Sequence, residues 1–214
     1  MPKIKREEVI REVLGAYKDS QKEYENWSGG SWLWEAPEYL ITVNIAKRLW
    51  ELRKRTSRCY ITLEYQVAKA LEDSGARGRG KLERKIRENG KTDIILWHAC
   101  GSPRALIEVK NQIYSTAAYK KDIDRIGGLL CKNPDKSSLE FGLISFYESA
   151  NSGKRKTAEE KVKARIEARL EECRRVADES LKQKAHLSEM HSINNGKSVW
   201  QAVCIELSKR FSCG

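Results

Sequence analysis

The prediction of the fold starts from the segment Lys91–Lys110, KTDIILWHACGSPRALIEVK. Two short apolar runs, Thr92–Trp97 and Arg104–Val109, flank a turn-rich connection, and this pattern is typical of two paired β-strands. Asp93 lies at the start of the first run and Glu108 near the end of the second. Because antiparallel pairing around a turn brings these two ends together, we expect the two carboxylates to lie close to each other.

Lys110 follows Glu108 at a spacing that places both side chains on one face of a strand, while Val109 points to the other face. Two adjacent carboxylates repel each other unless a cation lies between them, and hard oxygen ligands suit Mg²⁺ or Mn²⁺. An ammonium group on the same face would lie beside a metal-bound water. The residues therefore predict the outline of a hydrolytic site. The alternative is a surface hairpin whose acids and lysine are only solvated.

The pattern of Asp93 followed by Glu108-Val109-Lys110 resembles the core of the PD-(D/E)XK nuclease superfamily, which has the restriction-endonuclease-like fold. The resemblance covers roughly residues 60–147 and departs from the motif in that Thr92, not proline, precedes Asp93. It implies that the Asp and the Glu bind Mg²⁺ or Mn²⁺, with the Val109 carbonyl as a further ligand. It also implies that the lysine orients the attacking water.

Members of this superfamily often take one more acid from a helix that precedes the Asp strand. A short strand, Cys59–Thr62, and a helix, Leu63–Asp73, are expected here, so Glu64 would lie in the first helical turn. Glu38, in the helix before it, is the competing candidate, and Glu64 is favoured because its helix leads directly toward Asp93. An acid in a first turn is also favoured by the helix dipole alone, which applies equally to both.

The net charge of +11 is concentrated in two segments. Lys47–Arg58 and Arg77–Lys91 each carry a net charge of about +5, which predicts a basic patch rather than an even distribution of charge. Nucleic acid, with DNA favoured over RNA, is the expected partner, and a solvated charged face is the alternative. The residues expected to contact it are Arg53, Lys54, Arg55, Arg77, Arg79, Lys81, Lys121 and Arg125.

Periodicity predicts the remaining elements. Helices are expected over residues 4–25 and 37–54, and a third, Ser115–Leu130, should cross over to a strand, Glu140–Tyr147, that runs parallel to the Glu108 strand. A long helix, Thr157 to about Leu187, would pack on the sheet or recruit a partner or second copy, and a last strand would follow at Ser198–Leu207. The sequence thus predicts a single α/β domain over 1–214: a helical part (1–58), a nuclease-like core with a central mixed sheet (59–147), and a long helix with a final strand (151–214).

Three tryptophans, Trp27, Trp32 and Trp34, cluster around a Ser-Gly-Gly break. They could stack on bases, but packing of the N-terminal helix onto the domain is the favoured interpretation. Gln112 stands one strand alternation beyond Lys110 and could join the site. No apolar run is long enough for a membrane helix, and the N-terminus lacks the apolar core of a signal peptide, so a cytoplasmic protein is expected.

These observations together predict a Mg²⁺-dependent nuclease that hydrolyses phosphodiester bonds, expected to be an endonuclease. The alternative function is a non-catalytic nucleic-acid-binding or assembly protein on the same fold.

Overall fold

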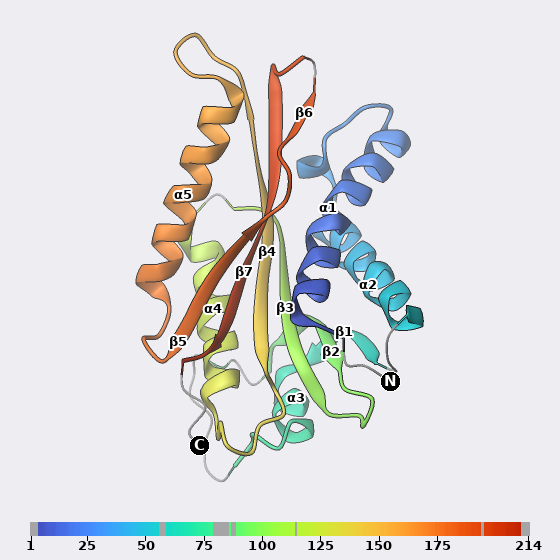
Figure 1. Cartoon of the computed structure of the whole chain (residues 1–214), viewed down its shortest axis with the longest axis vertical. Helices are drawn as coiled ribbons and strands as arrows, with labels where there is room; N and C mark the ends of the chain where they lie inside the picture. Colours follow the sequence, from blue (N-terminus) through green and yellow to red (C-terminus); the bar gives the residue numbers. More distant parts are fainter. Residues whose placement is uncertain are drawn as a thin grey trace.

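The computed structural model describes residues 4–55, 59–78, 86, 89–113, 115–193 and 195–210. Figure 1 shows a central sheet with helices on both of its faces, so the predicted α/β architecture is confirmed. The elements in chain order are α1 (Arg6–Ser28), the short 3₁₀ helix η1 (Leu33–Glu35), α2 (Glu38–Arg55), β1 (Tyr60–Gln66), α3 (Val67–Asp73), β2 (Lys91–Trp97), β3 (Pro103–Gln112), α4 (Thr116–Cys131), β4 (Phe141–Asn151), α5 (Ala158–Val176), β5 (Leu181–Leu187), β6 (His191–Ile193) and β7 (Ser198–Lys209).

The sheet is mixed and has seven strands in the order β1-β2-β3-β4-β7-β5, with β6 paired to β7. β1, β2 and β3 form an antiparallel meander, and β4 lies parallel to β3 after the chain has passed through α4. β7 then pairs antiparallel with both β4 and β5. The predicted hairpin and the predicted parallel crossover are therefore both present.

Strand alternation divides the core into two halves. Ile94 and Leu96 belong to the apolar cluster that contains α1 and α2, whereas Ile95 and Trp97 belong to the cluster that contains α3, α4 and α5. Figure 1 shows these helical layers on opposite sides of the sheet. Because Asp93 shares the parity of Ile95, its side chain lies on the α4 face of β2.

The expected boundary between the first strand and the following helix is wrong. β1 continues to Gln66 because Tyr65 and Gln66 pair with the start of β2, and α3 begins only at Val67. Glu64 therefore lies within a strand, at a φ of +52°, and not in a first helical turn. Pairing with a distant strand has overridden the local helix preference of this segment.

The long C-terminal helix is also shorter than expected. α5 ends at Val176, and the second part of the expected helix is the edge strand β5. A tight turn in which the Asp178 carboxylate accepts the Ser180 backbone N–H separates the two elements. The lysines of β5 suit an edge strand because they discourage pairing with another chain. A partner-binding helix over 157–187 is therefore not available in this fold.

Among the described residues, no helix combines the length and the apolar character that a membrane span requires.

Candidate active site

Asp93 and Glu108, the two acids predicted to bind a metal, face each other across the β2–β3 hairpin. The strand pairing ends with Ile94 and Ile107, and continuing the same register by one residue sets Asp93 against Glu108. Asp93 Oδ2 accepts the backbone N–H of Val109 at 2.7 Å, which fixes this carboxylate against β3. Directly opposite side chains on one face of a sheet have Cβ atoms about 5 Å apart. The two carboxylates therefore lie within reach of each other, as the hairpin pattern predicts.

Lys110 forms ion pairs with carboxylates from both helical layers. Its Nζ lies 3.2 Å from Asp122 Oδ2 on α4 and 3.6 Å from Glu38 Oε1 on α2, and it donates to the Val109 carbonyl at 3.1 Å. The side chain is 19% exposed, so one part of it still meets solvent. Lys110 thus lies between Asp93, Glu108 and two acids that come from distant parts of the chain.

Glu38, and not Glu64, is the additional acid at this site. α2 begins at Glu38, whose Oε2 accepts the backbone N–H of Asn111 at 2.9 Å while Oε1 faces Lys110. The Glu64 side chain is 46% exposed, and its nearest cation is Lys91 at 3.8 Å. The structure thus brings Glu38, and not Glu64, to Lys110, because the expected helix start at Leu63 is in fact part of β1.

Arg125 and Asp122 extend the site on α4. The Arg125 guanidinium donates to Glu108 Oε2 at 2.7 Å and to Asp122 Oδ1 at 2.5 Å, and all three side chains are buried. Arg125 is therefore not on an exposed face that contacts nucleic acid, contrary to expectation. Asp122 was not among the predicted site residues, although its spacing of three residues from Arg125 on one helix is a recognisable ion-pair pattern.

Burial dominates the electrostatics of the two central acids. It raises the pKa of Glu108 to about 8; the Arg125 charge opposes this shift, while Asp93 and Asp122 add to it. Burial also raises the pKa of Asp93, against the Val109 N–H and Lys110, which both lower it. Burial acts to lower the pKa of Lys110, but the charges of the surrounding acids outweigh it and the pKa is raised. The surrounding carboxylates therefore favour the charged form of Lys110.

The chemistry of the donor set fits a hard divalent cation. Within the part of the chain that the structure describes, and with every group charged, four carboxylates (Glu38, Asp93, Glu108 and Asp122) face two cations, Lys110 and Arg125. Glu108 Oε1 is buried and makes no well-formed hydrogen bond with any described residue. Carboxylate and carbonyl oxygens are the ligands that Mg²⁺ and Mn²⁺ prefer. However, the described ranges contain no group of three Asp, Glu, His or Cys side chains already arranged around one metal position.

The residues expected to contact nucleic acid differ in their exposure to solvent. Lys121 is exposed and Arg77 is half-exposed, whereas the Arg53 guanidinium lies over the Trp50 ring, 4.0 Å from its centroid. The remaining members of this set are outside the part that the structure describes: the side chains of Lys54 and Arg55, and the residues Arg79 and Lys81.

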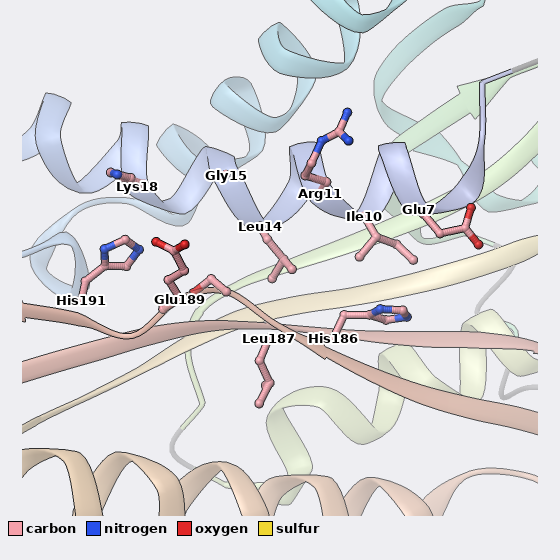
Figure 2. A pocket seen from close by; sticks show the side chains of 11 residues that line it. Glu7, Ile10, Arg11, Leu14, Gly15, Lys18, His186, Leu187, Glu189 and His191 are labelled. Carbon is pink, nitrogen blue, oxygen red and sulfur yellow. Dashed lines mark hydrogen bonds between the residues drawn. The ribbon is translucent and has the colours of Figure 1, made fainter.

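A separate hollow of about 470 Å³ lies between α1 and the β5–β6 connection (Figure 2). His186 lines it and pairs with Glu206 at 2.9 Å, and Arg6 holds the other oxygen of that carboxylate at 2.6 Å. The Arg6–Glu206 ion pair ties the N-terminal helix to β7, and His186 on the neighbouring β5 shares the same carboxylate. The hollow shares no residue with the Lys110 site; its lining is Glu7, Ile10, Arg11, Leu14, Gly15, Lys18, His186, Leu187, Ser188, Glu189 and His191.

Comparison of the chain with protein-family models, with curated proteins and with solved structures found no match.

Proposed function

We propose that the protein is a metal-dependent nuclease of the PD-(D/E)XK type, with DNA as the favoured substrate. The observation that carries the proposal is that Asp93, Glu108 and Lys110 come together at β2 and β3: Asp93 accepts the Val109 N–H, and Glu108 and Lys110 both contact side chains of α4. The order of β1 to β4, with β4 parallel to β3 after the α4 crossover, agrees with the mixed sheet and parallel crossover expected for a nuclease-like core. The net charge of +11 adds long-range attraction to a polyanion.

The residues have distinct roles in this proposal. Asp93, Glu108 and the Val109 carbonyl would hold Mg²⁺ or Mn²⁺, which lowers the pKa of a water and neutralises charge on the phosphate. Lys110 orients the nucleophile and stabilises negative charge in the transition state, because its carboxylate neighbours keep it protonated. Glu38 fixes the position of Lys110 and the main chain at Asn111.

Cleavage assays with single variants test the proposal. Plasmid, linear duplex and single-stranded DNA are incubated with Mg²⁺, Mn²⁺ or EDTA. We expect cleavage only with a divalent metal, and a loss of about 100-fold or more in Asp93→Ala and in Lys110→Met. Glu64→Gln, an exposed acid on the same meander, is the matched control and should cleave like wild type. Unchanged cleavage by Asp93→Ala would refute the site assignment.

Salt titrations test the nucleic-acid interface separately. Reversing the charge of Arg77 or Lys121 should weaken binding to all sequences alike and reduce the slope of log K against log salt by roughly one for each phosphate that the variant no longer neutralises. Arg125→Gln should not act in this way, because its side chain is buried against acids. Slopes identical to wild type in both surface variants would mean that this basic surface is only solvated.

A non-catalytic nucleic-acid-binding protein is the second candidate, and one observation favours it. The Arg125 guanidinium already occupies Glu108 and Asp122, which are two of the acids that a metal would need. Calorimetric titration of the purified protein with Mn²⁺ separates the two functions. Tight DNA binding without any saturable Mn²⁺ binding would favour the second candidate, whereas Mn²⁺ binding that Asp93→Ala abolishes would favour the nuclease.

A further inference from the structure

A hollow of about 380 Å³ lies immediately beyond Lys110 along β3. Gln112, two residues after Lys110, is part of its wall, and a spacing of two residues in a strand corresponds to roughly 7 Å. The hollow is formed where the segment around η1 meets α5 across the ends of β3 and β4. Its lining is Trp32, Trp34, Gln112, Ser149, Ala150, Asn151 and Arg165.

The aromatic side of this hollow is held rigidly. The Asn111 side-chain amide donates to the carbonyls of Leu33, Trp34 and Ala36 at 3.0, 3.4 and 2.7 Å, which ties η1 to β3. The buried Leu33 backbone N–H is in turn bound by the Gln21 side chain at 3.0 Å. Trp34 nevertheless remains 46% exposed. The main chain that carries Trp34 is thus held in place while its indole faces solvent, and packing of the N-terminal helix does not account for this exposure.

The opposite side of the hollow is polar. Among the described residues, the Gln112 amide makes a single long contact of 3.5 Å to Ser149 Oγ, and the Asn151 side-chain oxygen accepts from Ser198 at 2.8 Å while its amide nitrogen has no partner there. Arg165 is exposed and donates to the Ser149 carbonyl, and within the described ranges it makes no ion pair with a carboxylate. The hollow thus combines a stacking surface, amide groups and a cation.

We propose that this hollow binds one unpaired nucleobase of the substrate strand. Trp34 provides the stacking surface, Gln112 and Asn151 reach the edge of the base, and Arg165 contacts the adjoining phosphate. Aromatic stacking accepts any base, whereas a base inside a duplex has no free face to offer. The inference rests on the proposed nuclease function and makes it more specific: the strand that passes Lys110 is single-stranded, frayed or flipped at this position.

The experiment measures binding in EDTA, so that cleavage plays no part. Anisotropy titrations use a labelled short single-stranded DNA and the duplex of the same sequence, at one fixed salt concentration. We expect Trp34→Ala to weaken single-strand binding roughly 5- to 100-fold, the range for loss of one stacked base. Duplex binding should change by less than about 2-fold, because phosphate contacts carry it. Trp34→Phe should restore most of the single-strand affinity.

Trp27 provides the matched control, because it is 67% exposed on α1 and does not line the hollow. Trp27→Ala should leave both affinities unchanged. The inference is overturned if Trp34→Ala binds the single strand like wild type, if it weakens single-strand and duplex binding equally, or if wild type binds no single strand at all. A selective single-strand defect in a protein that cleaves nothing would refute the nuclease but keep the base-binding site.

Discussion

Replacing Glu108 by Gln should change the pH dependence of stability in a predictable way. Burial holds the pKa of Glu108 at about 8 in the folded protein, against an ordinary value of 4.5. Between these two values the unfolded chain has released the proton and the folded chain still holds it. The folded state therefore binds more protons, and its stability falls as the pH rises from 4.5 to 8. The contribution is fully present below pH 4.5 and is lost by about pH 8.

The magnitude follows from the size of the shift. At about 1.4 kcal/mol per pKa unit, the shift corresponds to a decrease of roughly 3–6 kcal/mol in the free energy of unfolding across this range. A glutamine resembles the protonated acid in shape and cannot ionise. We therefore expect Glu108→Gln to match wild type near pH 5 and to be several kcal/mol more stable at pH 8.5.

Urea unfolding in EDTA, followed by tryptophan fluorescence at several pH values, measures this difference. Subtracting the two stability curves removes the titration of every group that the variant leaves unchanged. Glu64→Gln, in which an exposed acid is replaced, should give a flat difference curve. A flat curve for Glu108→Gln as well would mean that Arg125 keeps Glu108 ionised at neutral pH, and the argument from burial would then be refuted.

Three further outcomes follow from particular contacts. Glu38→Gln should lower metal-dependent cleavage about 10- to 100-fold because it releases Lys110, with Glu64→Gln unaffected; equal activities would remove Glu38 from the site. Gly142→Ala should cost about 1–3 kcal/mol in urea unfolding, because the added Cβ would lie 2.2 Å from Ile126 Cγ2. Thr157→Ala should cost about 1 kcal/mol by removing the side-chain cap of α5, and an unchanged urea midpoint would contradict this.

The parts of the fold that the sequence predicted are those with local signals. The Ala99–Pro103 turn and the alternating apolar residues on either side specify the β2–β3 hairpin without reference to the rest of the chain. α4 carries an apolar stripe of helical period, and a helix between two apolar strands leaves a parallel crossover as the natural connection.

The errors concern segments that pair with a distant partner. β1 extends past Glu64 because β2, which begins only at Lys91, completes its hydrogen bonds. Leu181–Leu187 is a strand because β7 pairs with it, although its lysines and spacing also suit a helix. Local composition cannot distinguish these outcomes, since the deciding hydrogen bonds come from residues far away in the sequence.

The residues of the candidate site also fall into those with a local sequence signal and those brought in by distant packing. Asp93, Glu108 and Lys110 are predictable because one hairpin carries all three. Asp122 and Glu38 reach them only after α4 and α2 pack against the two faces of the sheet, so no sequence spacing reveals the contact. Choosing Glu38 over Glu64 required the boundary of β1, and that boundary is itself a tertiary property.

The position of Glu108 has no explanation in the packing of the fold. Its neighbours along β3, Ile107 and Val109, are apolar, and so is Ile144, which lies opposite it on β4. Burying a carboxylate there requires a buried arginine, and such ionic clusters can often be replaced by apolar side chains with no loss of stability or with a gain. A chain under selection for stability alone would therefore gain from an aliphatic residue at this position. A group that destabilises the free fold and keeps a buried oxygen without a well-formed hydrogen bond to any described residue is what a site for a charged ligand requires. This stability cost is an argument for function that does not depend on any motif.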